Sequence, residues 1–197
     1  MPTYVSDEIL DRFRKVTSAT AYSAVWRLTP SDGQEWFASA NYQLCLMRGV
    51  KAYTPGKILV GRAQTLRFVP ARPDLLKQTR KGGGSPEYLA MGKCGPNDVL
   101  VAEAHTFDEY SCILGNMKTR QLWHNKAQGI VTDGAIRDLQ MISDEYDLAV
   151  FAKNRSPAGN LPFLESFEEG QPINVGGVLV MPGDVIVGDD DGVVVVP

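Results

Sequence analysis

The chain has 197 residues, 44% of them hydrophobic and 22% charged, which is typical of a globular protein with a sizeable core. Twenty basic residues against 23 acidic ones give a formal net charge of −3, and no basic stripe indicates a nucleic-acid partner. Three widely spaced cysteines form no CxxC pattern, so neither a zinc or redox site of that kind nor a disulfide framework is predicted. We expect a single domain over residues 1–197.

The start of the chain is polar and lacks the apolar core of a signal peptide. No apolar run approaches the roughly 20 residues that a membrane-spanning helix needs. We therefore expect a cytoplasmic protein without a membrane partner.

The first part of the chain predicts a helical segment over about residues 6–28. Ser6 would cap an amphipathic helix, and a second helix is expected over residues 17–28, where small side chains allow close packing. Residues 29–50 show no clear period, and we interpret them as a connecting excursion.

The middle of the chain alternates strand-like and helix-like segments. Apolar runs rich in β-branched residues predict strands at residues 58–69, 99–104, 129–131 and 148–152. Helical patterns predict a short helix at residues 87–91, a helix over about 117–127 and a helix that begins at Asp138.

Three consecutive glycines, residues 82–84, must be weighed as a phosphate-binding loop. A P-loop needs GxxxxGK[ST], and the nearby Gly92-Lys93-Cys94 lacks the hydroxyl residue. No GxGxxG occurs either, so nucleotide binding is not supported. We interpret the run as a flexible linker, with a mobile lid as the alternative.

From about residue 172 to residue 197 the chain is β in character, with turn residues that separate four short strands. The run Asp189-Asp190-Asp191-Gly192 lacks the 12-residue spacing of a calcium loop, and we interpret it as an acidic hairpin turn. The alternating middle and the hairpin tail together predict a layered α/β fold with flanking helices, built on one mixed sheet or on two stacked sheets.

A candidate site lies in the segment from Gly129 to Asp138. Its apolar start predicts a buried strand and Asp133-Gly134 a turn, so Arg137 and Asp138 should lie where a strand leads into a helix. In open α/β sheets ligands usually bind there. An Arg fork suits a carboxylate, and an Asp supplies a hard oxygen ligand for a divalent cation. The alternative is structural: an acid at a helix start beside a surface ion pair.

A second junction runs from Gly115 to Lys118, at the predicted start of another helix. Helix N-termini present unpaired backbone N–H groups to anions, and Gly115 permits close approach. The N–H groups of Asn116 and Met117 could therefore hold a carboxylate. If the two strands are parallel neighbours, Arg137 would hold the same carboxylate from the adjacent junction.

Proton transfer at such a site needs an acid or base, and histidine is the usual group near neutral pH. His105 follows a predicted strand and could approach the site, whereas His124 lies within a predicted helix. Glu103 and Asp108 are further candidates. For both histidines an ordinary polar or capping role is the alternative.

Several ordered motifs match one known family. They are Thr17-Ser18-Ala19-Thr20, Gly61-Arg62-Ala63, Gly115-Asn116-Met117 and residues 97–101, 129–138, 175–178, 182–185 and 189–197. In these motifs the chain resembles the 4-hydroxy-4-methyl-2-oxoglutarate aldolases, a family that also contains the regulator of ribonuclease activity A. The match covers most of the chain from about residue 17 onward.

The resemblance implies a layered β/β/α fold of the swivelling-domain kind, assembled as homotrimers or homohexamers with active sites between subunits. It implies class II aldolase or decarboxylase chemistry, that is a lyase, on pyruvate-containing acids such as 4-hydroxy-4-methyl-2-oxoglutarate or oxaloacetate. The implied cofactor is Mg²⁺ or Mn²⁺.

The family's site pattern can be carried over residue by residue. Arg137 would bind the pyruvate carboxylate and keto oxygen, Asp138 would ligate the metal, and the backbone from Gly115 to Lys118 would complete the carboxylate pocket. Asn116 stands where the family has an acidic residue, so it can accept a hydrogen bond but adds no negative charge. Ser23 likewise stands where the family usually has an Asp.

Two functions stay open at this point. One is a metal-dependent lyase, favoured by the Arg137-Asp138 pair. The other is a non-catalytic protein that regulates a protein partner, favoured by the neutral Asn116. A methyltransferase is set aside, because the chain has no glycine-rich cofactor loop after an early strand.

Overall fold

The computed structural model describes residues 5–28, 44–104 and 110–197. Its strands are β1 (Lys51–Ala52), β2 (Leu59–Pro70), β3 (Asp98–Glu103), β4 (Cys112–Leu114), β5 (Gly129–Ile136), β6 (Ala149–Arg155), β7 (Leu164–Glu169), β8 (Ile173–Val175), β9 (Val178–Val180), β10 (Val185–Asp189) and β11 (Gly192–Val196). Its helices are α1 (Asp7–Phe13), α2 (Ser18–Leu28), α4 (Leu76–Thr79), α5 (Pro86–Lys93), α6 (Asn116–His124) and α7 (Leu139–Glu145), with a 3-10 turn at Gly82–Gly84.

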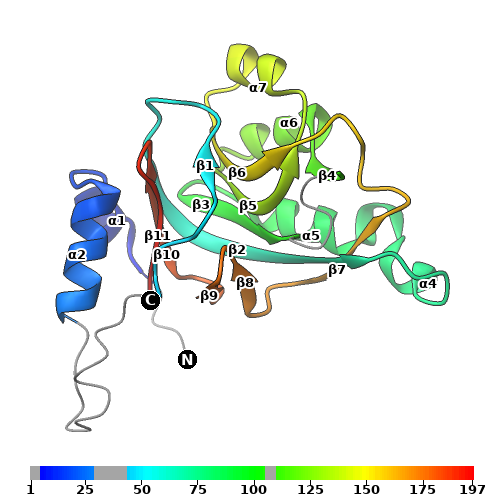
Figure 1. Cartoon of the computed structure of the whole chain (residues 1–197), viewed down its shortest axis with the longest axis horizontal. Helices are drawn as coiled ribbons and strands as arrows, with labels where there is room; N and C mark the ends of the chain where they lie inside the picture. The colour runs from blue at the N-terminus through cyan, green and yellow to red at the C-terminus, as the bar shows by residue number, and fades with distance from the viewer. Residues whose placement is uncertain (1–4, 29–43, 105–109) are drawn as a thin grey trace, which may run out of the picture.

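One mixed sheet organises the chain. Its strands follow the order β1-β6-β5-β3-β2-β10-β11, with β4 added beside β5 and β7 beside β2. Strands β2, β3, β5 and β6 pair in parallel, and the other pairings within this central path are antiparallel. The hairpin β8–β9 forms a separate two-stranded sheet. Figure 1 shows α5, α6 and α7 on one side of the curved sheet and β8–β9 on the other.

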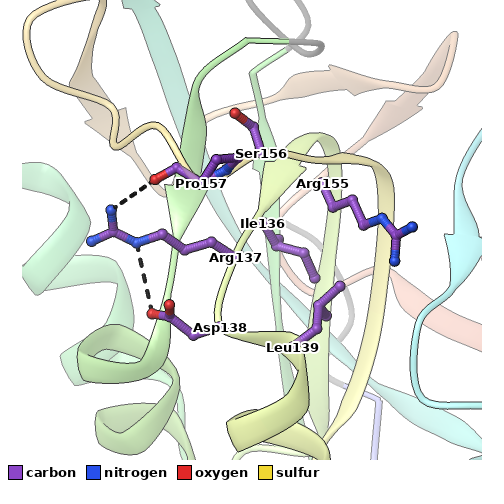
Figure 2. Close-up of a pocket in the computed structure, with 7 residues that line it drawn as sticks. All are labelled: Ile136, Arg137, Asp138, Leu139, Arg155, Ser156 and Pro157. Atoms are coloured by element: carbon purple, nitrogen blue, oxygen red, sulfur yellow. Dashed lines mark hydrogen bonds and ion pairs between the residues drawn. The ribbon is translucent and has the colours of Figure 1, made fainter.

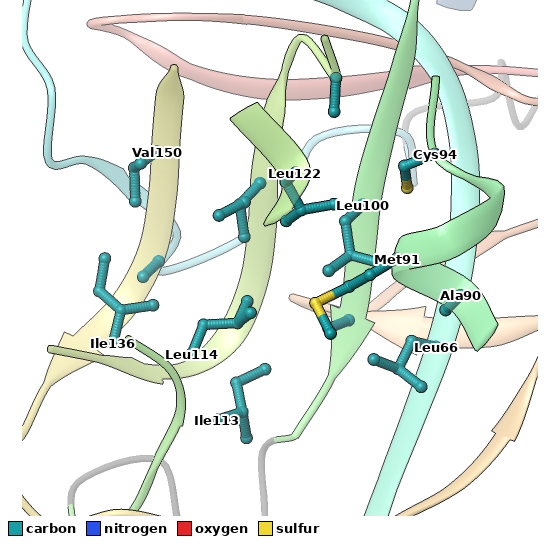
Figure 3. Close-up of a cluster of buried hydrophobic side chains, with 14 of the residues drawn as sticks. Leu66, Ala90, Met91, Cys94, Leu100, Ile113, Leu114, Leu122, Ile136 and Val150 are labelled. Atoms are coloured by element: carbon teal, nitrogen blue, oxygen red, sulfur yellow. The ribbon is translucent and has the colours of Figure 1, made fainter. Parts of the chain in front are cut away.

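Two apolar clusters lie on the two faces of the parallel strands. Leu100, Ile130 and Val150 belong to the cluster under the helices, which Figure 3 shows together with Leu122 from α6. Their sequence neighbours Val99, Val101, Val131 and Phe151 belong to the second cluster, which also contains residues of β8, β9, β10 and β11. Because both faces are covered, these strands are continuous apolar runs in the sequence. The predicted layered α/β fold is confirmed.

The helices α1 and α2 cover the other end of the sheet, beside β10 and β11 (Figure 1). Leu10 of α1 and Ala21 of α2 are buried there with Val185, Val187 and Val194. The acidic turn between β10 and β11 is the predicted hairpin, and its Asp189 accepts hydrogen bonds from the backbone and side chain of Ser18. None of the helices within the described ranges is long and apolar enough to cross a membrane.

The predicted turn at Asp133-Gly134 is wrong, because β5 continues through it to Ile136. The pairing of β5 with β6 shifts between Thr132 and Ala135, so this stretch is an irregularity inside a strand. The buried carboxylate of Asp133 accepts hydrogen bonds from the backbone N–H groups of Ala104 at 2.8 Å and Gly176 at 3.2 Å. A polar pair typical of turns is thus used inside the sheet.

Other boundaries also differ from expectation. The glycine run forms a short 3-10 turn, and α6 ends at His124 because Lys126 adopts a left-handed backbone with φ +64°. Strands β1, β4 and β7 were not predicted. The predictions that concern residues 29–43, His105 and Asp108 lie outside the described residues.

Candidate active site at the ends of β4 and β5

The parallel strands β4 and β5 bring the two predicted strand–helix junctions together. Leu114 pairs with Ile136, and the backbone N–H of Arg137 donates to the carbonyl of Leu114 at 3.1 Å. Helix α6 begins directly after β4, and α7 directly after Asp138. The predicted proximity of Gly115 to Arg137 is therefore confirmed.

Gly115 lies in close contact with both side chains of the Arg137-Asp138 pair. A Cβ atom at this position would lie 2.7 Å from Oδ2 of Asp138 and 2.9 Å from Nε of Arg137. Its backbone is extended, a conformation that any residue can adopt. Glycine is therefore needed here because a Cβ atom would not fit, and not because of the dihedral angles. The two functional candidates thus lie directly against the backbone that precedes α6.

Asp138 occupies a left-handed backbone conformation, φ +62° and ψ +27°, at the N-cap of α7. Few residues other than glycine adopt it, although Asp tolerates it better than most. One carboxylate oxygen, Oδ2, accepts the backbone N–H of Asn116 at 2.8 Å, so Asp138 caps the neighbouring helix α6 rather than its own. The N–H that was expected to hold a ligand carboxylate is therefore already bonded within the chain.

Arg137 lies beside this carboxylate and is half exposed. Its Nε is 3.6 Å from Oδ2 of Asp138, and its Nη1 donates to the carbonyl of Pro157 at 3.3 Å. The side chains of the pair are 44% and 40% exposed, which leaves both open to a ligand from solvent. Figure 2 shows both contacts.

The pair lines a pocket of about 480 Å³, a size within the usual range of small-molecule sites. Its lining comes from the end of β5, the start of α7 and the residues that end and follow β6. These residues are Ile136, Arg137, Asp138, Leu139, Arg155, Ser156 and Pro157.

The other predicted site residues lie beside this pocket and do not line it. The side-chain oxygen of Asn116 accepts a hydrogen bond from the hydroxyl of Tyr146 at 2.5 Å. The ammonium of Lys118 binds Glu87 at 2.7 Å and the carbonyl of Ile113 at 2.8 Å. Met117 is 76% exposed. The roles of these residues in ligand binding stay predictions. Because the ammonium of Lys118 is already bonded to Glu87 and Ile113, only the backbone of Lys118 could contact a ligand in this conformation.

Burial shifts the pKa values of two further groups near the site. Burial raises the pKa of the Tyr146 hydroxyl, with the charge of Glu145 adding to the effect. Burial also raises the pKa of the Cys112 thiol against the opposing influence of Arg137. A buried thiol with a raised pKa is a poor nucleophile, so Cys112 is a core residue of β4.

The candidates for acid or base that the structure describes lie apart from the pocket. His124 is at the far end of α6 from Asn116, about 12 Å along the helix axis. Glu103 accepts hydrogen bonds from Arg67 at 3.1 Å and from the backbone N–H of Asn174 at 2.9 Å. Both therefore fit ordinary structural or surface roles.

Arg155, Ser156 and Pro157 are pocket residues that the sequence reasoning missed. Arg155 ends β6, which is parallel to β5 and pairs with it as far as Ile136. The same rule that selected Arg137, a polar residue at the carboxyl end of a parallel strand, could have selected Arg155. The strand was predicted to end at Ala152, three residues too early.

A family model described as RraA-like, aldolase/RraA, matches residues 7–195. The chain belongs to the RraA-like family. A solved relative, Streptomyces coelicolor RraAS2, described as an unusual member of the RNase ES inhibitor RraA family, is 28% identical. It superposes with a TM-score of 0.79 over 99% of this chain and 87% of that one.

Curated relatives match shorter segments of the chain. An uncharacterised protein of Methanocaldococcus jannaschii is 37% identical over 51% of this chain and 48% of its own length. A Halalkalibacterium halodurans protein, provisionally named a 4-hydroxy-4-methyl-2-oxoglutarate aldolase, is 33% identical over 61% of this chain and 56% of its own length. The chain thus spans about half the length of these curated relatives.

Proposed function

We propose that this chain is a divalent-metal-dependent carbon–carbon lyase that acts on a pyruvate-containing oxo acid, of the 4-hydroxy-4-methyl-2-oxoglutarate or oxaloacetate type. The observation that carries the proposal is the packing of Arg137 and Asp138 against Gly115 at the rim of a 480 Å³ pocket. A cation and an anion held half exposed at the carboxyl end of a strand suit a ligand more than they suit stability.

Arg137 would bind the carboxylate and the keto oxygen of the substrate. Its contacts to Pro157 and Asp138 are long, at 3.3 Å and 3.6 Å, and no hydrogen bond donated by Nη2 is found among the described residues. The guanidinium can therefore turn its remaining N–H groups toward an acid, to which it can bind in the bidentate manner. The carbonyl of Pro157 would keep the fork oriented.

The donors present suit a loosely held divalent ion. Asp138 keeps one carboxylate oxygen, Oδ1, without a hydrogen bond in the described part of the chain. No cluster of three or more His, Cys, Asp or Glu side chains converges there within those residues. Mg²⁺ commonly takes one or two protein carboxylates and fills its shell with water and ligand oxygens, so Asp138 would hold it. Such an ion supplies a Lewis acid for the negative charge that develops on C–C cleavage.

Other residues of the chain would orient Asp138 and form the wall of the pocket. Gly115 and the backbone N–H of Asn116 fix the Asp138 carboxylate, so that little reorganisation is needed when a ligand binds. The apolar side chains of Ile136 and Leu139 form part of the pocket wall, against which the carbon chain of the acid can pack.

The deciding experiment is pyruvate release from 4-hydroxy-4-methyl-2-oxoglutarate and from oxaloacetate, with Mg²⁺ or with EDTA. Loss of oxaloacetate in protein-free buffer is subtracted. We expect turnover to need the metal and to fall on the order of 10²–10³-fold in Asp138→Ala. Asp144→Ala is the matched control, since it removes an equally charged, exposed residue of α7 outside the pocket. Turnover that survives EDTA or Asp138→Ala would contradict the proposal.

The homotrimer or homohexamer implied by the family resemblance belongs to the same proposal. Exposed apolar side chains on the two helices that begin at the site, Met117, Trp123 and Met141, support an association surface on α6 and α7. Light scattering coupled to size exclusion should give a mass of three or six chains, and a monomer at micromolar concentration would contradict it.

A regulatory protein remains the second candidate function, and the environment of Asn116 favours it. This residue adds no negative charge to the site, and its oxygen is already bonded to Tyr146. The solved relative is described as a member of an RNase ES inhibitor family. Inhibition of a ribonuclease of that type by this chain, unchanged in Asp138→Ala, would support this function, and no inhibition would remove it.

A further inference from the structure

Residues 156–159, here called the strap, follow β6 and run along the side chain of Arg137. The carbonyl of Pro157 accepts a hydrogen bond from Nη1 of Arg137 at 3.3 Å, and a Cβ atom at Gly159 would lie 3.4 Å from the same nitrogen. Figure 2 shows Pro157 facing the guanidinium. The orientation of Arg137 therefore depends on where the strap lies.

β4 and the residue before it hold the far end of the strap. The backbone N–H of Cys112 donates to the carbonyl of Ala158 at 2.7 Å, and the hydroxyl of Ser111 donates to the carbonyl of Gly159 at 2.9 Å. Ser111 is 0% exposed, and no other acceptor for its hydroxyl is found among the described residues. It does not line the pocket and cannot touch a ligand there. Its bond to the strap is thus the route by which Ser111 can act on the site.

The start of the strap is fastened as well. The backbone N–H of Ser156 donates to the carbonyl of Ile136 at 3.0 Å. The Ser156 hydroxyl donates to the carbonyl of Tyr110 and accepts the N–H of Ala158 at 3.2 Å. Pro157 therefore lies between two fixed points, and its own ring fixes φ. Its carbonyl stays directed at Arg137 as long as both points hold.

A fixed acceptor matters because Arg137 has little else to hold it. Its side chain is 44% exposed, and its contact to Asp138 is 3.6 Å long. Holding a long, exposed side chain in one rotamer opposes its conformational entropy, and a mobile acceptor does not offset that cost. A carbonyl that is already fixed loses no freedom of its own when it accepts the bond, so it can orient the guanidinium.

We propose that Ser111 is a positioning residue for Arg137. Its buried hydroxyl fixes Gly159, the strap fixes the carbonyl of Pro157, and that carbonyl holds the guanidinium so that a ligand meets it in one orientation. The role of Arg137 toward an oxo acid rests on the proposed function, whereas its orientation is a property of the ligand-free chain. The two can therefore be tested separately.

Nitrogen-15 NMR of the full chain tests the orientation, through the rate at which the Arg137 guanidinium rotates about its Cζ–Nε bond. The signal is identified by its loss in Arg137→Lys. We expect Ser111→Ala to speed this rotation about fivefold, the factor that one ordinary hydrogen bond represents. Ser111→Cys keeps a weaker donor and should give an intermediate rate.

Thr65→Val is the matched control. Thr65 is 1% exposed, and its hydroxyl donates to the carbonyl of Gln171 at 2.7 Å, outside the pocket. This variant also loses a buried hydroxyl bonded to a loop, so stability should fall while the rotation of Arg137 stays unchanged. An equal increase in rotation in Thr65→Val and Ser111→Ala, or no increase in either Ser111 variant, would overturn the proposal.

Calorimetry with pyruvate and with Mg²⁺ as separate probes tests the consequence for binding. We expect Ser111→Ala to weaken pyruvate binding about threefold to fivefold and Mg²⁺ binding less than about twofold. The reason is that the strap is bonded to Arg137, while no bond from it to Asp138 is found in the described ranges. Equal losses for both probes would indicate a general change in structure and would overturn the proposal. If rotation rises in Ser111→Ala but the wild type binds no pyruvate, the lyase proposal fails and the positioning role stands.

Discussion

Two arginine–aspartate groups lie at opposite ends of the parallel strands and differ in almost every physical respect. At the amino end of β3, Arg62 is 7% exposed and lies between Asp7 at 2.8 Å and Asp98 at 3.5 Å. It also donates to a backbone carbonyl at 2.9 Å. At the carboxyl end of β5, Arg137 is 44% exposed and lies 3.6 Å from Asp138.

The difference separates a group that stabilises the fold from one that is available to a ligand. Arg62 has its hydrogen bonds satisfied by the chain, so a ligand could bind it only by breaking them. Arg137 makes two long contacts and keeps donors that face solvent. The same two residue types therefore predict function only when exposure and partners are known.

The largest effect expected at the amino end is on stability. Arg62→Met should lower the free energy of unfolding by about 3 kcal/mol, because it removes a buried guanidinium and leaves the partly buried carboxylate of Asp98 without its cation. Urea denaturation followed by circular dichroism measures this change. Metal-dependent turnover per folded molecule should stay unchanged, since Arg62 lies at the opposite end of the strands from the pocket.

A matched control uses the pair Arg72–Asp74, whose side chains are 66% and 59% exposed. Arg72→Met should produce no measurable change in stability, because solvent screens an exposed pair of this kind. If Arg62→Met lowers the free energy of unfolding no more than Arg72→Met does, the buried group at the amino end does not stabilise the fold as proposed.

Much of the fold could be predicted because the sequence pattern and the burial agree. The eight residues of β5 are all buried, and its apolar run is visible in the sequence, as are those of β2, β3 and β6. Strands β1 and β4, of two and three residues, are too short to show a period. Strand β7 reads Leu-Glu-Ser-Phe-Glu-Glu, and its burial does not alternate, because Glu165 is buried against Arg80.

The candidate site was predictable in position and less so in detail. The pattern placed Arg137, Asp138 and Gly115 together, which the pairing of β4 with β5 confirms. It could not show that Asp138 would take the N–H of Asn116, because that contact depends on a left-handed residue at the start of α7. Nor could it show Tyr146 as the partner of Asn116, because the two lie on different elements 30 residues apart.

Gly115→Ala tests whether the Arg137-Asp138 pair at the carboxyl end of β5 depends on its contact with Gly115. The added methyl group would lie 2.7 Å from the Asp138 carboxylate and 2.9 Å from Nε of Arg137, so both side chains must move. The ends of flexible side chains can shift, and we expect the fold to remain while kcat/KM falls by up to about 100-fold. Pyruvate release and calorimetric binding of pyruvate measure the effect.

Gly92→Ala is the matched control for this change. An added Cβ at Gly92, in α5, meets no atom within 4 Å, and alanine there should raise stability by about 0.5–1 kcal/mol. Its turnover should equal that of the wild type. Equal turnover in the Gly115 and Gly92 variants would show that the Arg137-Asp138 pair does not depend on the contact with Gly115.

The smallest effect expected is an acid-dependent one at Asp7. The hydrogen bond from Arg62 is the largest reason that the pKa of Asp7 lies below its ordinary value, and desolvation opposes it. The unfolded chain, with a pKa near about 4, therefore binds this proton more readily than the folded chain does. The contribution of Asp7 to stability is present above that pKa and lost as pH falls through the lowered folded pKa.

Asp7→Asn should accordingly be less stable than wild type by a constant amount between about pH 5 and pH 8, and the two should converge as pH falls from about 4 through the lowered folded pKa of Asp7. Urea midpoints across this range measure the difference. In the Arg62→Met background the same substitution should have little effect at any pH, because the partner is gone. If the changes in the free energy of unfolding from the two substitutions add independently, Arg62 does not set the pKa of Asp7. That pKa would then depend on Asn97 and Arg14, and Arg62 would stabilise the fold through Asp98 alone.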